Sequence, residues 1–185
     1  LNDDGILIKS NKNIILDFNA IAKGYTVDII SKYLEKKGAQ NYLVEIGGEI
    51  MAKGLSPRNN QPWKIGIDYP SSNSLNTKNY TTYLLSNKAI ATSGNYRHYR
   101  VDNLTGKRIF HTIDPRTGKS VQSKILSTSV VALDCASADA WATGLMVLDL
   151  EEGLKLIEKN SDLEALWIIE NDNALNSVYS SGWEN

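Results

Sequence analysis

Asp139 and Thr143 are two side chains whose types and spacing suit the binding of a hard metal cation. Because they lie four residues apart, a helix places both on one face near its N-terminus. A carboxylate and a hydroxyl supply oxygen ligands of the kind that Mg²⁺ binds together with substrate phosphates. The alternative is that Asp139 serves only the first turn of the helix and that Thr143 is an ordinary helix residue.

Lys23 and Gly24 form a second candidate group, because the glycine interrupts a helical pattern. Glycine inside a helix costs about 1 kcal/mol relative to alanine, so its presence indicates close approach by a neighbour or a ligand. Close packing of the helix on its sheet is the ordinary explanation, and this stretch alone leaves both open.

The two histidines are the remaining candidates for acid–base chemistry. His111 precedes an Asp-Pro-Arg-Thr-Gly turn at residues 114–118 that fixes the local geometry. A lone histidine is more often structural than catalytic, and His98 is expected to be a surface or strand residue. The sequence contains no CxxC or HExxH zinc motif, no GxGxxG or phosphate-binding loop, and no GxSxG elbow for a serine nucleophile.

Hydrophobic periodicity predicts the elements that position these residues. Residues 127–133 are expected to form a buried strand, followed by a helix at 138–148 with Ser137 as its N-cap. Two further helices are predicted at residues 20–37 and 151–160. The remaining strands are expected at residues 5–9, 13–18, 42–46, 49–53, 63–68, 81–86, 88–93, 163–170 and 174–180.

Three of the expected connections have specific geometries. Residues 5–9 and 13–18 are predicted to pair as a hairpin, and 81–86 with 88–93 as a strand pair that turns at Asn87. Gly47 and Gly48 indicate a bulge, or a stretch of backbone exposed to a ligand.

Length and composition limit the class of protein. The 185 residues suit a single domain of residues 1–185, and the net charge of −1 argues against a nucleic-acid partner. No apolar run reaches membrane-spanning length, and the single cysteine, Cys135, allows no internal disulfide. Since the sequence begins at Leu1 with strand-like residues and no signal peptide, we expect a processed chain or a piece of a longer one.

Five stretches, taken in order, resemble the ApbE family of FAD:protein FMN transferases. They are DFNAIAKGYTVD (17–28), VEIGGEI (44–50), ATSGNYRHY (91–99), HTIDPRTGKSV (111–121) and ASADAWAT (136–143). The resemblance implies an α+β fold related to the T-fold, in which antiparallel sheets pack with helices. It also implies that a threonine or serine hydroxyl of a target flavoprotein attacks the FMN-side phosphorus of FAD and that AMP is released.

The resemblance assigns roles to seven residues. It implies that Mg²⁺, with Ca²⁺ as an alternative, is bound by the Ala20 carbonyl, Asp139 and Thr143. Asp17, Lys23 and Ile113 match positions that contact FAD. His111 matches a motif histidine that acts as a base or orders the metal site.

The family usually has a longer N-terminal segment, which this sequence is expected to lack. That segment implies an exported parent protein, located outside the cytoplasm and held to the membrane only by an N-terminal lipid anchor. Two other functions fit the same residues: a metal-dependent FAD pyrophosphatase, in which water replaces the threonine, and a non-catalytic flavin-binding module.

Overall fold

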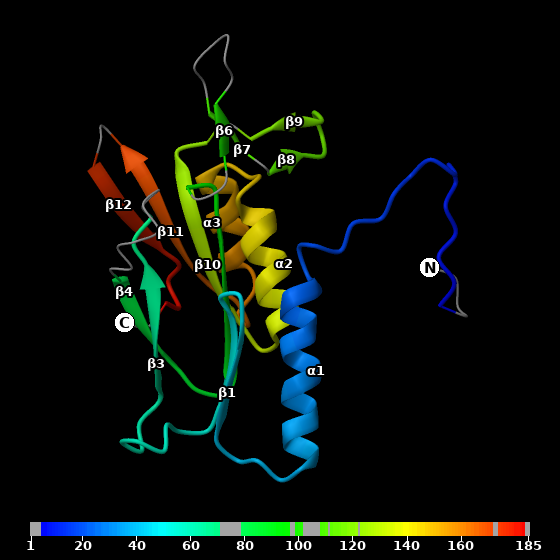
Figure 1. The fold of residues 1–185 in the computed structure, drawn as a ribbon. Helices are drawn as coiled ribbons and strands as arrows, with labels where there is room; N and C mark the ends of the chain where they lie inside the picture. The colour runs from blue at the N-terminus through cyan, green and yellow to red at the C-terminus, as the bar shows by residue number, and fades with distance from the viewer. Residues whose placement is uncertain are drawn as a thin grey trace.

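An antiparallel sheet of six strands is the centre of the computed structural model (Figure 1). The structure describes residues 5–70, 79–96, 99–101, 108–110, 112–121, 123–171 and 174–183. The sheet has the order β1-β2-β5-β10-β11-β12. Its strands are β1 (Tyr42–Ile46), β2 (Glu49–Lys53), β5 (Lys88–Gly94), β10 (Ile125–Ala132), β11 (Glu164–Asn171) and β12 (Ala174–Tyr179).

Three helices pack on one face of this sheet, and a two-stranded sheet covers the other (Figure 1). The helices are α1 (Ala22–Lys36), α2 (Cys135–Leu145) and α3 (Leu150–Glu158), and the two strands are β3 (Trp63–Asp68) and β4 (Asn79–Leu85). This layered arrangement confirms the α+β fold. No helix among the described residues is both long and apolar enough to cross a membrane.

The central strands contribute to two hydrophobic cores because both of their faces are buried. In β10, Val130 and Ala132 join the core beneath the helices, while Val131 lies in the core beneath β3 and β4. Trp167 and Leu166 of β11 divide between the cores in the same way. Successive side chains of a strand point to opposite faces, so burial on both faces explains the continuous apolar runs in these strands.

Two short hairpins lie beyond the six-stranded sheet. One pairs β6 (Tyr99–Val101) with β7 (Arg108–Phe110), and the other pairs β8 (Ile113–Asp114) with β9 (Lys119–Ser120). The second hairpin encloses the predicted turn at residues 114–118, which confirms that turn.

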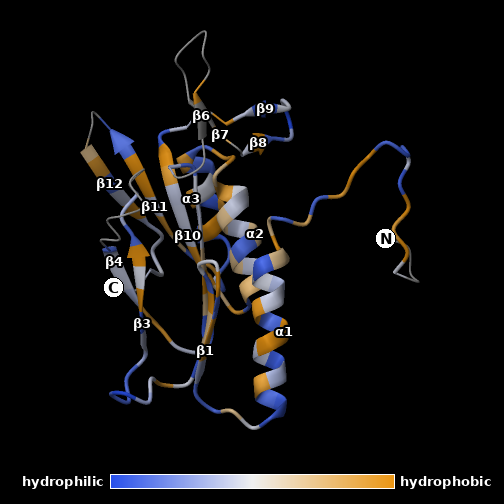
Figure 2. Cartoon of the chain, in the orientation of Figure 1, coloured by the Kyte–Doolittle hydropathy of each residue, from blue (hydrophilic) through white to orange (hydrophobic). Residues whose placement is uncertain are grey.

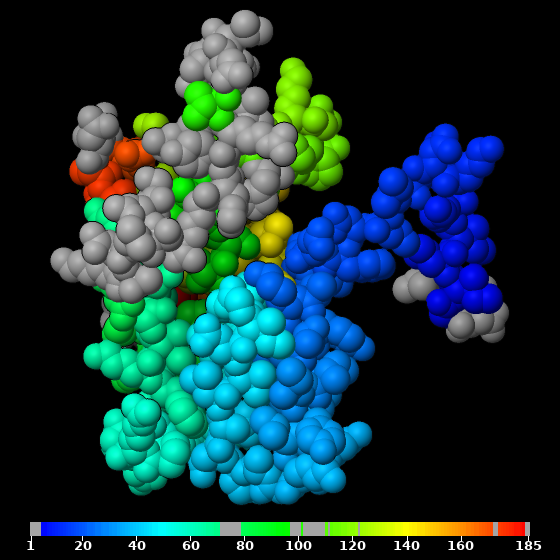
Figure 3. Space-filling model, in the orientation of Figure 1, coloured from blue at the N-terminus to red at the C-terminus, as the bar shows by residue number. Residues whose placement is uncertain are grey.

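The hairpin predicted for residues 5–18 is wrong. Residues 5–18 form no strand, and the segment extends away from the rest of the molecule (Figure 3). Figure 2 shows apolar residues along this segment, which lies apart from the sheet and helices. Its apolar side chains are all exposed: Ile6, Leu7, Ile8, Ile14, Ile15, Leu16 and Phe18. A hairpin without a third strand or a helix to pack on is only marginally stable, and the exposed apolar side chains of this segment have no such packing.

Two predicted connections also differ from the structure. The strands on either side of Asn87 do not pair with each other, because β4 pairs with β3 while β5 pairs with β2 and β10. Gly47 and Gly48 form a tight turn between β1 and β2 rather than a bulge, since Ile46 pairs directly with Glu49. Both glycines have positive φ, as a two-residue hairpin turn of this twist requires.

Helix α2 begins three residues earlier than predicted. Asp134, not Ser137, is its N-cap, and the Asp134 carboxylate accepts a hydrogen bond from the Ser137 backbone N–H at 2.8 Å. Asp and Ser are comparable N-caps, so the sequence alone did not separate the two starts.

Candidate functional site

The N-terminal part of α1 lies directly against the N-terminal part of α2 (Figure 1). The Gly24 backbone N–H of α1 donates to Asp139 Oδ2 of α2 at 3.0 Å. A Cβ atom on Gly24 would lie only 2.2 Å from the Cys135 carbonyl oxygen, so only glycine permits this approach. The neighbour that Gly24 admits is therefore the backbone of α2, and the sheet is not involved.

Asp28 makes the reciprocal contact from α1 to α2. Its two carboxylate oxygens accept the backbone N–H groups of Cys135 and Ala136 at 2.8 and 2.9 Å. The Asp134 carboxylate accepts the Ser137 N–H, so carboxylates of the protein already satisfy the first N–H groups of α2. Those groups are not available to a phosphate, although the helix dipole still favours negative charge nearby.

Lys23 and Glu49 form an ion pair beside this junction. Lys23 Nζ lies 2.8 Å from Glu49 Oε1, and the Glu49 side chain is only 2% exposed while that of Lys23 is 47% exposed. Glu49 Oε2 is also buried and has no hydrogen-bond partner among the described residues. The junction therefore contains a buried oxygen whose hydrogen-bonding capacity is unused.

Thr143 lies one turn beyond Asp139 on α2 and faces strand β5. Its hydroxyl forms a hydrogen bond of 3.0 Å with the Ser93 hydroxyl. Asp139 is 3% exposed, so its side chain is buried and does not face solvent. Thr143 is half-buried.

Burial makes ionisation of the two carboxylates at the junction less favourable than it is in water. Burial raises the pKa of Asp139, although the Gly24 N–H and the Lys23 ammonium oppose that shift. Burial also raises the pKa of Glu49, against the effect of Lys23 and with a further contribution from the Asp139 charge. A bound cation would stabilise the ionised form of both groups.

The oxygen atoms at this junction fit a hard divalent cation. The Asp139 carboxylate and the Thr143 hydroxyl are ligand types that Mg²⁺ accepts, and the unpartnered Glu49 oxygen lies close enough to interact electrostatically with Asp139. The described residues contain no cluster of three or more His, Cys, Asp or Glu side chains of metal-site geometry. A cation here would accordingly depend on the hydroxyl, on backbone carbonyls and on substrate phosphate in addition to one carboxylate.

The structure brings only some of the predicted site residues together. Lys23 and Asp139 meet at the junction, with Thr143 one turn further along α2. Ala20 is half-buried just before α1, and Asp17 is exposed, its carboxylate accepting the Asn19 backbone N–H at 2.7 Å.

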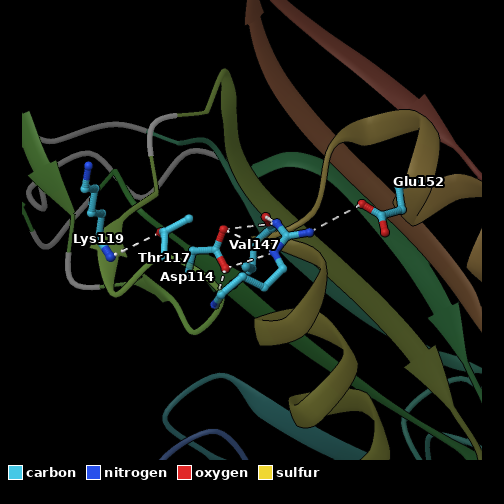
Figure 4. Close-up of polar contacts among 6 residues, drawn as sticks. Asp114, Thr117, Lys119, Val147 and Glu152 are labelled. Atoms are coloured by element: carbon cyan, nitrogen blue, oxygen red, sulfur yellow. Dashed lines mark hydrogen bonds and ion pairs between the residues drawn. The ribbon is translucent and has the colours of Figure 1, made fainter.

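Ile113 and His111 belong to a different part of the chain. Ile113 lies on β8 and is 51% exposed, and His111 lies outside the described residues. The turn that follows Ile113 is fixed to the helices (Figure 4): Arg116 contacts Asp114 at 3.0 Å, the Val147 carbonyl at 3.4 Å and Glu152 at 4.0 Å. These contacts attach the turn of the β8–β9 hairpin to Val147, just after α2, and to Glu152 of α3.

Three residues at the junction had no role assigned from sequence: Asp28, Glu49 and Ser93. Each occurs within one of the stretches that resemble the family, yet none belongs to a recognisable ligand spacing. A signal existed for Glu49, because alternation along β2 places Ile50 and Ala52 in the core under β3 and β4 and turns Glu49 toward the helices.

Both the sequence and the fold of this chain are similar to those of known proteins. Residues 1–167 match the model of the ApbE family. The chain is 38% identical over 178 residues to a FAD:protein FMN transferase of Vibrio cholerae, covering 96% of this chain and 52% of the relative. It is 39% identical to that of Haemophilus influenzae, covering 96% of this chain and 50% of the relative.

Solved structures show the same similarity. The flavin transferase ApbE from Vibrio cholerae aligns with a TM-score of 0.75 at 38% identity, over 90% of this chain and 50% of that one. The apo flavinyl transferase ApbE of Pseudomonas stutzeri aligns with a TM-score of 0.75 at 35% identity, over 90% of this chain and 49% of that one. The chain spans about half the length of the relatives it matches. The family match over most of the chain and the matching fold together show that this chain belongs to the ApbE family.

Proposed function

We propose that this chain is the site-bearing part of a FAD:protein FMN transferase, which moves the FMN portion of FAD onto a threonine or serine hydroxyl of a flavoprotein. The supporting observation is the junction of α1 and α2, where the buried Asp139 carboxylate accepts the Gly24 N–H beside the Lys23–Glu49 ion pair. The names of these two relatives, each a FAD:protein FMN transferase, support the same activity.

Asp139 and Thr143, with the Ala20 carbonyl, would hold Mg²⁺, and Ca²⁺ is the alternative ion. When bound there, the ion would neutralise charge on the diphosphate of FAD. The Gly24 N–H and the Ser93 hydroxyl fix the orientation of the two side-chain ligands through their hydrogen bonds. Such supporting contacts commonly change metal affinity about 10- to 100-fold.

Lys23 would supply positive charge to the diphosphate, with Asp17 and Ile113 as further contacts to FAD. The N–H groups at the start of α2 are occupied by Asp28 and Asp134, so Lys23 carries more of the charge compensation than a helix terminus does. Charge neutralisation and alignment are the main requirements of phosphoryl transfer.

The reaction breaks one bond and forms one at the FMN-side phosphorus. The acceptor hydroxyl oxygen forms a new P–O bond, the bond between that phosphorus and the bridging oxygen breaks, and AMP leaves with that oxygen. The hydroxyl proton passes to a base, for which His111 is the candidate.

The test is in-gel flavin fluorescence of an acceptor flavoprotein after incubation with FAD, Mg²⁺ and this protein. We expect a fluorescent acceptor band that survives denaturation, and no such band when the acceptor threonine is changed to valine. Release of FMN and AMP without a labelled acceptor would instead favour the FAD pyrophosphatase. FAD binding without loss of FAD would favour the flavin-binding module.

The family resemblance also supports the proposal that the parent protein acts outside the cytoplasm, attached through an N-terminal lipid anchor. Fractionation of cells that produce the parent protein, with lipid labelling of its N-terminus, tests this location independently of the activity.

A further inference from the structure

We propose that Glu49 is a positioning residue for FAD binding, whose carboxylate holds the Lys23 ammonium at the junction of α1 and α2. This inference rests on the proposed function, in which Lys23 contacts the diphosphate of FAD. It assigns a role to a residue that lies on β2, outside both helices of the junction.

The contacts of Lys23 show how its position is fixed. Its ammonium is 2.8 Å from Glu49 Oε1, and a Cβ atom on Gly47 would lie 3.4 Å from Lys23 Cδ. The side chain of Lys23 therefore extends from α1 over the Gly47–Gly48 turn and ends on the carboxylate that follows the turn. Because a lysine side chain loses rotamer entropy when it is immobilised, a lysine already held in place binds its ligand at a lower entropic cost.

A second ion pair in the same molecule, between Lys88 and Glu164, also has a mostly buried carboxylate and serves as a comparison. Glu164 lies between the sheets with one carboxylate oxygen on the Tyr83 hydroxyl at 2.6 Å and the other on Lys88 at 2.5 Å. Both of its oxygens are thus satisfied. Glu49 differs, because its Oε2 is buried without a partner among the described residues.

An unsatisfied buried carboxylate oxygen lowers stability, so Glu49 is poorly explained as a stabilising residue. The Lys23 side chain is nevertheless 47% exposed, so part of it can meet an incoming ligand. The pair combines a buried carboxylate with a partly exposed lysine, which is the arrangement expected of a pre-positioned binding group.

The experiment is a double-mutant cycle on the dissociation constant of FAD, measured by quenching of flavin fluorescence at constant Mg²⁺ with Glu49→Gln, Lys23→Met and the double variant. We expect Glu49→Gln to weaken FAD binding roughly 10-fold, on the scale of one charge-assisted hydrogen bond. In the Lys23→Met background the same change should have no further effect, because Glu49 acts through Lys23. The double variant removes both charges and leaves neither group unpaired. If Glu49→Gln folds poorly, the double variant is compared with Lys23→Met alone, and equal FAD dissociation constants are expected because Glu49 acts through Lys23.

Glu35→Gln is the matched control. Glu35 forms an ion pair of the same length, 2.8 Å, with Lys53 near the opposite end of α1, so its loss should leave the FAD dissociation constant unchanged. Three results would overturn the proposal: additive losses of FAD affinity in the cycle, an unchanged FAD dissociation constant in Glu49→Gln, or tighter FAD binding by that variant. Tighter binding would mean that Glu49 competes with phosphate for Lys23. The FMN-transfer assay is a separate measurement. Coupled effects of the two substitutions on FAD binding without FMN transfer would refute only the proposed function. FMN transfer without such coupling would refute only the positioning role of Glu49.

Discussion

Replacing Gly24 by alanine tests the contact that joins α1 to α2. The added Cβ would lie 2.2 Å from the Cys135 carbonyl oxygen and 2.9 Å from the Ala136 Cα, both atoms of the backbone. Relief requires the two helices to separate by about 1 Å or more, since non-bonded carbon contacts are favourable only near ~3.5 Å. That separation also lengthens the 3.0 Å hydrogen bond from the Gly24 N–H to Asp139.

The size of the effect follows from three contributions. Overpacking costs about 1–3 kcal/mol, and weakening a hydrogen bond to a buried carboxylate costs about 1.5–3 kcal/mol. The better helix propensity of alanine returns about 1 kcal/mol. We expect a net loss of roughly 3 kcal/mol in the free energy of unfolding, which lowers Tm by about 6–12 °C in a protein of this size.

The assay is thermal unfolding followed by circular dichroism, with Gly144→Ala as the matched control. Gly144 is also a helical glycine, in α2, but a Cβ there meets no atom within 4 Å. The control should therefore be as stable as the original protein or gain up to about 1 kcal/mol from helix propensity. A Gly24→Ala variant that unfolds at or above the original temperature would refute the close approach of the two helices.

Three further outcomes concern Asp28, Cys135 and His111. Asp28→Ala should lower the free energy of unfolding by about 2 kcal/mol, because the N–H groups of Cys135 and Ala136 lose their acceptors, and chemical denaturation measures this. The Cys135 thiol, whose pKa is raised mainly by burial, should resist a thiol reagent at pH 8 in the native protein and react once per chain in denaturant. His111→Ala should slow FMN transfer about 10²- to 10⁴-fold with little change in the FAD dissociation constant if it is the base; equal losses in both would mark it as a pocket residue.

Periodicity and turn residues predicted most of the fold. The strands β1, β3, β10 and β11 and the helix α1 lie within a few residues of their expected ranges, since each has a strong apolar pattern and clear terminators. The α+β fold itself came from the family resemblance. The prediction of a hairpin at residues 5–18 failed because an apolar pattern shows that side chains favour burial but not which part of the molecule they pack against.

The contacts of the site depended on information that the sequence does not contain. The spacing of Asp139 and Thr143 was visible in the sequence. The contact of Asp139 with the Gly24 N–H, which joins two helices, was not. Glu49 and Ser93 reach the same region from β2 and β5, because these strands are neighbours in the sheet although they are far apart in the sequence. Such long-range pairing follows from topology, which local patterns do not specify.

The most direct test of the central claim is the anomalous diffraction of Mn²⁺, used in place of Mg²⁺, in crystals of the protein grown with FAD. We predict an anomalous peak about 2.1 Å from an Asp139 carboxylate oxygen and from the Thr143 hydroxyl, with the Ala20 carbonyl as a further ligand and the diphosphate of FAD adjacent to Lys23. A peak elsewhere in a crystal with FAD bound, or FAD bound away from the junction of α1 and α2, would contradict the account.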